Sequence, residues 1–291
     1  MERFQVHINS KYGIQIENDS SNLLFQEGQD IVNSANGQVV RCWLESATIP
    51  HGWYNFTEKN RNVKVHIVGH GTEEFQFPLA QLTAADVKSI LNQWFTGNQF
   101  NWAVFKFDST RSKFLLDDLN SDLEFRDIEH NAYYELGFKP IIGKTINSKP
   151  DLNDHVNACD LSGTKKLFIS LQGLSASAKP SYNGFDNTPL LACIPVSSEF
   201  TEVEIYVPPN PFVVEQQSFQ LGCFTIQLLD EDGDYVKMNG NDWSCSITFE
   251  IEDRPMEGFL TNANPYDAPI SNYVTDINSV DRLRRNFDEQ N

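Results

Sequence analysis

The chain has 291 residues, of which 40% are hydrophobic and 12% aromatic, so it can bury a large core and is not a disordered protein. Lys and Arg number 22 against 40 Asp and Glu, which gives a net charge of −18 at pH 7. A surface of this sign repels phosphate backbones and anionic lipids. We therefore expect no nucleic-acid partner and no binding to anionic membranes.

The cysteines predict a reducing compartment. They are odd in number, contain no CxxC pair and fall mostly in strand-like runs: Cys42, Cys159, Cys193, Cys223 and Cys245. Free cysteines in strands behave as small apolar residues, so we expect buried thiols and no disulfide framework. The first residues lack an apolar signal-peptide core, and no apolar run approaches about 20 residues. We therefore expect no signal peptide and no membrane-spanning helix.

The first third of the chain predicts strands. Residues 1–36 are polar, with short candidate strands at Phe4–Ile8 and Leu23–Phe25. A stronger strand, Val39–Ile49, alternates apolar and polar residues and stops at Pro50. Period-two alternation places the apolar residues on one face of a strand, so this face is expected to be buried. Two further strands follow at Val63–Ile67 and Glu73–Leu79.

One segment predicts a helix, Ala84–Phe95. Thr83 and Asp86 have the spacing of a capping box, and Gly97 supplies a stop signal. Apolar residues recur with helical period along one stripe: Val87, Ile90, Leu91, Trp94 and Phe95. We expect this stripe to pack on a sheet made from the strands that follow. Those strands are predicted at Ala103–Phe107, Lys113–Leu116 and Leu123–Phe125, before a short helical turn at Asn131–Leu136.

The second half returns to strands. They are predicted at Lys165–Leu171, Leu190–Val196 and Val203–Val207, the last ending at Pro208. Leu221–Ile251 then reads as two strands folded back as a hairpin, because Asp232-Gly233 and Asn239-Gly240 are turn dipeptides. Its predicted core face comprises Phe224, Ile226, Leu228, Trp243, Ile247 and Phe249.

A hairpin with one apolar face needs a second sheet to cover it. The predicted fold is therefore an all-β antiparallel sandwich with a helix-containing α+β insertion and a C-terminal arm. The predicted organisation is an N-terminal segment (1–36), the first part of the sandwich (37–81), the insertion (82–138), the second part (139–253) and the arm (254–291).

The most metal-like cluster is the acidic turn at residues 230–234. An EF-hand loop needs Gly at its sixth position and Glu at its twelfth, whereas this run has Gly233 fourth and Asn241 twelfth. We favour a solvated turn. The weak candidates for metal ligands are Asp230, Asp232 and Asp234.

No other pattern predicts a reaction centre. His66 and His70 are four residues apart, a spacing that suits zinc on a helix but not in the strand or turn expected here. Nucleophile-elbow, dinucleotide-binding and phosphate-loop motifs are absent from the sequence. We favour core packing over a sugar-binding stripe for the scattered aromatics Trp43, Trp53, Tyr54, Trp102 and Trp243. We expect no catalytic residue, no cofactor and no enzymatic activity.

Three stretches in this order resemble a known family. They are Ser46–Asn55 (SATIPHGWYN), the helix-containing unit that closes on Tyr134–Phe138 (YELGF), and Thr225–Ile251 with its DEDG and NGNDW turns. Together they resemble the single jelly-roll penton (minor capsid) proteins of virophages, Polinton-like viruses and adintoviruses. The resemblance covers most of residues 37–252 and leaves the N-terminal segment and the arm uncovered.

The resemblance implies a structural virion protein. Such proteins form homopentamers at the fivefold vertices of an icosahedral capsid, beside major capsid proteins that form double jelly-roll capsomers. It implies a place in the virion capsid, assembly in the host cytoplasm or nucleus, and no catalytic residues. We expect the arm to reach a neighbouring capsid protein. The alternatives are a carbohydrate- or receptor-binding β-sandwich, such as a viral spike protein, and an enzyme on a jelly-roll scaffold.

Overall fold

The structure is a computed structural model that describes residues 2–16, 20–26, 30–35, 38–100, 103–117, 122–147, 154, 156–174, 189–217 and 220–253. The chain divides into two units, Met1–Glu252 and Asp253–Asn291. The strands and helices described below belong to the first unit, with Asp253 the last residue of its final strand. The predicted arm, 254–291, lies outside the described residues and stays a prediction.

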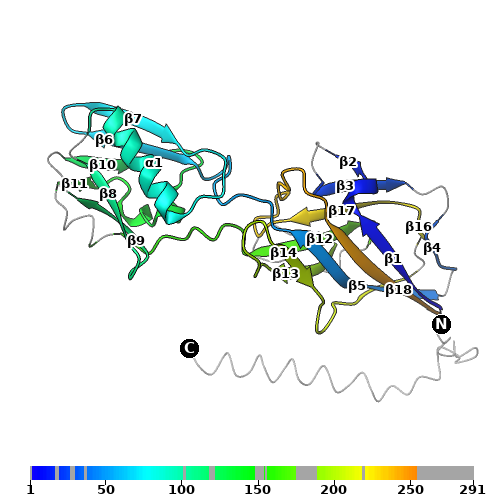
Figure 1. Cartoon of the computed structure of the whole chain (residues 1–291). Helices are drawn as coiled ribbons and strands as arrows, with labels where there is room; N and C mark the ends of the chain where they lie inside the picture. Colours follow the sequence, from blue (N-terminus) through cyan, green and yellow to red (C-terminus); the bar gives the residue numbers. More distant parts are fainter. Residues whose placement is uncertain are drawn as a thin grey trace, which may run out of the picture. The chain divides into compact units, whose positions relative to one another are not determined.

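Two five-stranded antiparallel sheets form the larger part of the first unit (Figure 1). In order across the first sheet lie β1 (Glu2–Asn9), β18 (Ser244–Asp253), β5 (Gln38–Pro50) and β14 (Val203–Tyr206), with β15 (Val214–Gln217) also paired to β5. Across the second sheet lie β13 (Leu190–Pro195), β12 (Lys166–Gln172), β17 (Cys223–Leu229), β3 (Asn22–Gln26) and β2 (Ile14–Gln15).

The order of these strands defines a jelly roll. We count the main strands along the chain as β1, β3, β5, β12, β13, β14, β17 and β18. In this count, the strands across the first sheet are the first, eighth, third and sixth of the chain. Those across the second sheet are the fifth, fourth, seventh and second. Successive strands thus alternate between the sheets, except that β12 and β13 pair within the second sheet, which is the double Greek-key pattern of a jelly roll. This topology confirms the all-β sandwich predicted from the sequence.

The apolar faces of the two sheets meet in one core. All six residues predicted as its face are buried, with Ile226, Leu228 and Ile247 fully inaccessible. The predicted hairpin is nevertheless wrong, because β17 and β18 belong to different sheets and do not pair. Alternation reports which face of a strand is buried but not which strand lies beside it. The turn residues between them carry the chain across the sandwich.

A second core forms around residues 56–161. Its four-stranded sheet has the order β11 (Thr145–Ile146), β10 (Leu123–Arg126), β6 (Asn62–Ile67) and β7 (Gly71–Gln76). Beside it, β8 (Val104–Asp108) pairs with β9 (Lys113–Asp117). The remaining short elements of the first unit are η1 (Ser10–Tyr12), β4 (Val32–Asn33), α2 (Tyr133–Leu136), η2 (Lys139–Ile141) and β16 (Gln220–Leu221).

The predicted helix is confirmed as α1 (Ala84–Gly97). Thr83 accepts a hydrogen bond from the backbone of Asp86, whose carboxylate in turn accepts from the Thr83 N–H, so the capping box is complete. Val87, Leu91 and Phe95 are buried in the second core, where α1 packs against β8. The apolar stripe therefore packs against a following strand, as its helical spacing predicts.

The core boundaries differ from the predicted division. Strands β6 and β7 were assigned to the first part of the sandwich (37–81), but they pack in the second core. The predicted N-terminal segment contributes β1 and β3 to the jelly roll, where Phe4 stacks on Phe249. Both strands were predicted, as the candidates Phe4–Ile8 and Leu23–Phe25, but their place in the sandwich was not. Among the described residues, no helix is long and apolar enough to cross a bilayer.

Candidate interaction surface

Strand β14 has its polarity reversed relative to an ordinary edge strand. Its inward residue Glu204 is only 7% exposed, whereas its outward neighbour Ile205 is 71% exposed. Pairing with β5 sets this phase, because Glu204 lies opposite buried Ile49 and Ile205 lies opposite exposed Thr48. Alternation correctly predicts the strand, but the usual inference that its apolar residues are buried fails. The sheet instead presents β-branched apolar side chains to solvent.

The inward carboxylate of Glu204 accepts hydrogen bonds at both of its oxygens. Its Oε2 accepts from the backbone N–H groups of Ser197 and Ser198, both at 2.8 Å, and Oε1 accepts from the Ser197 hydroxyl at 3.0 Å. Burial alone raises the pKa of the Glu204 carboxyl, but these bonds outweigh it and hold the pKa below its ordinary value. The ionised carboxylate therefore holds β14 in its reversed phase.

The segment after β14 extends the apolar surface. Val207, Phe212 and Val213 are all strongly exposed, and Pro208, Pro209 and Pro211 lie between them. We call the exposed apolar residues from Val203 to Val213 the β14 strip. Pro lacks a backbone N–H and stops strand pairing, which explains why β14 ends at Tyr206. No charged residue occurs between Glu204 and Glu215.

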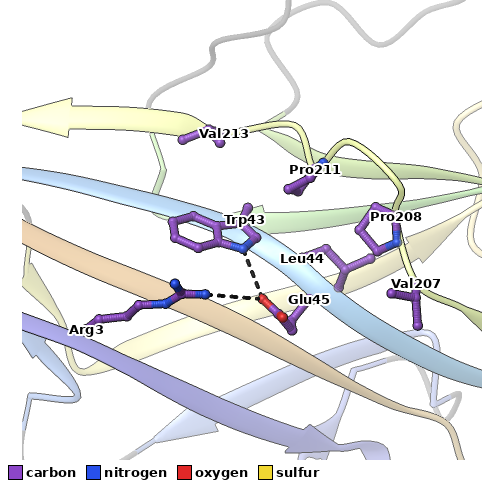
Figure 2. Close-up of a pocket in the computed structure, with 8 residues that line it drawn as sticks. All are labelled: Arg3, Trp43, Leu44, Glu45, Val207, Pro208, Pro211 and Val213. Carbon is purple, nitrogen blue, oxygen red and sulfur yellow. Dashed lines mark hydrogen bonds and ion pairs between the residues drawn. The ribbon is translucent and has the colours of Figure 1, made fainter.

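A shallow groove of about 350 Å³ runs along the inner side of this strip (Figure 2). Val207, Pro208, Pro211 and Val213 line it together with Arg3 and three consecutive residues of β5, Trp43, Leu44 and Glu45. Figure 2 shows the Trp43 ring lying in the groove with its N–H directed at Glu45. The groove is thus walled by prolines, valines and an indole.

The polar groups of the groove already have partners. Glu45 Oε2 accepts from Trp43 Nε1 at 3.1 Å and from the Thr248 hydroxyl at 3.0 Å, and it lies 4.0 Å from Arg3. The Arg3 guanidinium also lies over the Trp43 ring, 5.2 Å from its centroid. The groove therefore has apolar walls, and the Glu45 carboxylate beside it already has hydrogen-bond and ionic partners. Such a surface suits an apolar side chain from another polypeptide better than a reacting group.

The metal candidates predicted from the sequence lie in a hydrogen-bonded turn. Asp230 Oδ1 accepts from the backbone N–H of Asp232 at 3.0 Å and of Asp234 at 2.9 Å. Lys59 forms ion pairs with Asp230, at 3.4 Å, and with Asp234. Gly233 has a left-handed φ of 84°, which its position in the turn requires. In the part of the chain that the structure describes, no three His, Cys, Asp or Glu side chains group to hold a metal ion.

The two histidines four residues apart have separate surroundings. His66 Nδ1 lies 3.0 Å from the Thr72 hydroxyl, whereas the ring of His70 meets Phe100 edge-on. His66 lies on β6, and His70 lies in the turn that follows it. Their spacing therefore reflects a strand and a turn, as the sequence predicts.

The cysteines are free, as predicted, but two of the predicted buried thiols are exposed. Cys42 and Cys245 lie in the jelly-roll core, where burial raises the pKa of each thiol to about 12. Cys193 and Cys223 are exposed instead. The prediction treated every strand cysteine as a core residue. The register of β13 and β17, however, directs these two side chains away from the core.

Tryptophan positions divide in a similar way. Trp53 and Trp243 are buried in the jelly-roll core, as predicted, and Trp243 donates its ring N–H to the Ser20 carbonyl at 2.6 Å. Trp43 is not a core residue, because it shares the outward face of β5 with Arg41 and Glu45. That alternation was visible in the sequence. Trp102 lies outside the described residues.

Sequence reasoning recognised β14 but missed the strip as a functional surface. The available signal was a run without charge, rich in proline and apolar residues, directly after a short strand. Proline excludes such a run from a central strand, so its apolar residues lie at an edge or in a loop. Apolar residues in that position are exposed unless something covers them.

Comparison with known proteins gives matches among solved structures. No family model matches the chain, and no curated protein matches its sequence. Among solved structures, the chain is similar to the crystal structure of the selenomethionine-labelled mavirus penton protein, with 13% identity, a TM-score of 0.49, and coverage of 87% of this chain and 100% of that chain.

Proposed function

We propose that this chain is a structural virion protein, a penton protein that forms homopentamers at the fivefold vertices of an icosahedral capsid. The observation that carries the proposal is the reversed edge strand β14, which exposes Val203 and Ile205 while it buries Glu204. The outward face of an antiparallel sheet is ordinarily polar, whereas the outward face of β14 is apolar. Such a surface is stable in a finished assembly, where another polypeptide covers it.

The fold is compatible with this role but does not select it. Jelly rolls occur in viral capsid proteins, in lectins and in cupins, so the topology alone leaves several functions open. The sequence motifs resemble penton proteins specifically, and the exposed strip favours assembly over small-molecule chemistry. We further propose that the protein is not an enzyme, that it resides in the virion capsid, and that it assembles in the host cytoplasm or nucleus.

The domain organisation follows the two cores. We propose a jelly roll made from residues 1–55 and 162–253, with residues 56–161 inserted between β5 and β12. Asn55 lies where the chain enters the insertion, and its amide Nδ2 donates to the carbonyls of Leu82 and Leu161 at 2.9 and 2.8 Å. This buried amide joins the entry and exit of the inserted segment.

The stoichiometry test is the mass of the purified full chain in native mass spectrometry. We expect a discrete species of five copies at high protein concentration. A trimer, or a monomer that binds defined glycans on an array, would overturn the pentamer and support the carbohydrate- or receptor-binding alternative.

The location test is an image of the assembled particle. We expect fivefold density at the vertices into which the jelly roll can be built, beside the major capsid protein. We also propose that residues 254–291 contact that neighbour, so a chain truncated after Asp253 should still form pentamers but lose vertex incorporation. Full incorporation of the truncated chain would contradict the proposed role of the arm.

A further inference from the structure

The exposed apolar residues of the jelly roll are concentrated in two places. Among the described residues of the jelly roll, the large apolar side chains with high exposure are Tyr12, Ile14, Val203, Ile205, Val207, Phe212, Val213 and Tyr235. Five of these residues form the β14 strip. Tyr12 and Ile14, which are 78% and 55% exposed, form a second group at η1 and β2 that we call the β2 edge.

The strip and the β2 edge lie on opposite sides of the sandwich. Strand β14 ends the first sheet, and β13 ends the second sheet on the same side, because residues 196–202 connect the two directly. On the other side, β1 and β2 end the two sheets and are joined through η1. The labels β13 and β14 in Figure 1 accordingly lie across the jelly roll from β1 and β2.

Two different apolar surfaces on opposite sides favour a head-to-tail contact. When one surface of a copy meets the other surface of the next copy, each addition leaves the same two surfaces at the ends. Such a heterologous contact closes into a ring when the rotation that relates neighbouring copies is a whole fraction of a full turn. A contact of the strip with itself would instead stop at a dimer and leave the β2 edge uncovered.

Charge supports the same pairing. The chain carries −18, so copies repel each other over most of their surface, and the strip is uncharged between Glu204 and Glu215. Lys11, exposed beside Tyr12, provides a cation at the β2 edge. Exposed Glu199 and Glu202 provide anions directly before Val203. Both surfaces are therefore apolar, and the charges beside them are of opposite sign.

We propose that the β14 strip of one copy packs against the β2 edge of the next copy, and that this contact forms the ring. The inference rests on the proposed function and adds the location of its interface. Contact is made by side chains and not by a long continuous sheet, since Pro208 and Pro209 prevent strand pairing beyond Val207. The groove beside Trp43 receives an apolar side chain at the margin of the same surface.

The test is cross-linking between two variants that each carry one introduced, exposed cysteine. Exposed Cys193 and Cys223 are first replaced by Ser, which leaves the buried Cys42 and Cys245 and the half-buried Cys159. Ile205→Cys is made in one sample and Ile14→Cys in another, both at exposed positions where the substitution leaves the core intact. The proteins are treated with a short bifunctional maleimide, separately and as an equimolar mixture.

We expect covalent dimers in the mixture and none in either protein alone. A chain with both cysteines should give a ladder that ends at five copies. The matched control is Val68→Cys, exposed on the insertion, which should not cross-link to Ile205→Cys. Separately, Ile205→Asp should weaken the association about tenfold or more, because it places a charge where an apolar side chain is buried.

The outcomes separate this inference from the proposed function. Dimers of Ile205→Cys alone would show a strip-to-strip contact and overturn the inference. No cross-link in the mixture, while native mass spectrometry still shows five copies, would place the interface elsewhere and leave the proposed pentamer intact. A cross-linked ladder that ends at another number would support the contact and overturn the pentamer. No cross-link and no oligomer would overturn both.

Discussion

Glu204 is the residue on which the reversed phase of β14 depends. An acid at an inward position is costly unless every lone pair that faces the protein is used, and here Ser197 and Ser198 supply the donors. Sequence patterns treat an acid within an alternating apolar strand as a solvent-facing residue. The pattern therefore predicted the strand correctly but not its phase, because pairing with β5 sets the phase and donors on a neighbouring loop stabilise the inward carboxylate.

Replacing Glu204 by Gln should destabilise the first unit by about 1–3 kcal/mol, since the neutral amide makes weaker bonds with the two N–H groups and its NH2 group replaces the oxygen that accepts from the Ser197 hydroxyl. The lowered pKa of Glu204 also makes a pH prediction. Its stabilisation is complete above the ordinary Glu pKa and is lost as the pH falls through the lower, folded-state pKa. Urea unfolding measured at a series of acidic pH values should show this loss in the wild type and less of it in Glu204→Gln.

The matched control is Glu199→Gln, at an exposed carboxylate in the same loop. This change should alter the free energy of unfolding by less than about 0.5 kcal/mol. An equal effect of the two substitutions would show that loss of net negative charge, and not the hydrogen bonds at Glu204, accounts for the change.

At the scale of single elements, the start and the buried face of α1 were predictable, although the helix includes Gly97 and so runs two residues past its predicted end at Phe95. The β17–β18 connection was not predictable. A helix can be predicted from signals within its own sequence, such as the Thr83 and Asp86 capping box and the apolar stripe of α1. A strand needs a partner that is distant in the chain. The turn dipeptides between Leu229 and Ser244 favour reversal, and nothing local shows that the reversal leads into the opposite sheet.

Thr83→Ala should weaken α1 by about 1 kcal/mol, because it removes the acceptor for the Asp86 N–H at the helix N-terminus. Hydrogen exchange of the α1 amides measures this local loss, with faster exchange expected in the first turn. Ser89→Ala removes a hydroxyl from the exposed middle of the same helix and should leave the exchange unchanged or slightly slower, because Ala has the higher helix propensity. Faster exchange in both variants would contradict a capping effect.

For the whole molecule, the sequence supports the architecture more strongly than the boundaries. Hydrophobic periodicity established that apolar faces must meet. The insertion was drawn at 82–138, however, because β6 and β7 look like any other alternating strands. Their membership in the second core depends on contacts with α1 and the later strands. Likewise, no local signal shows that the β14 strip and the β2 edge lie on opposite sides, which only the strand order reveals.

Net charge makes a further prediction for the assembly. Each copy carries −18, so bringing copies together costs electrostatic free energy, while the proposed interface is mainly apolar. Raising the salt concentration from about 0.1 to about 1 M shortens the screening length from roughly 10 to roughly 3 Å, which weakens this repulsion. In the proposed contact, an exposed ion pair between Lys11 of one copy and Glu202 of the next would contribute at most about 1 kcal/mol. Its screening by salt therefore cannot outweigh the weaker repulsion between copies. The pentamer fraction should therefore rise with NaCl in sedimentation velocity at fixed chain concentration, as a discrete boundary and not as a broad aggregate. Dissociation on adding salt would show instead that ion pairs hold the ring together.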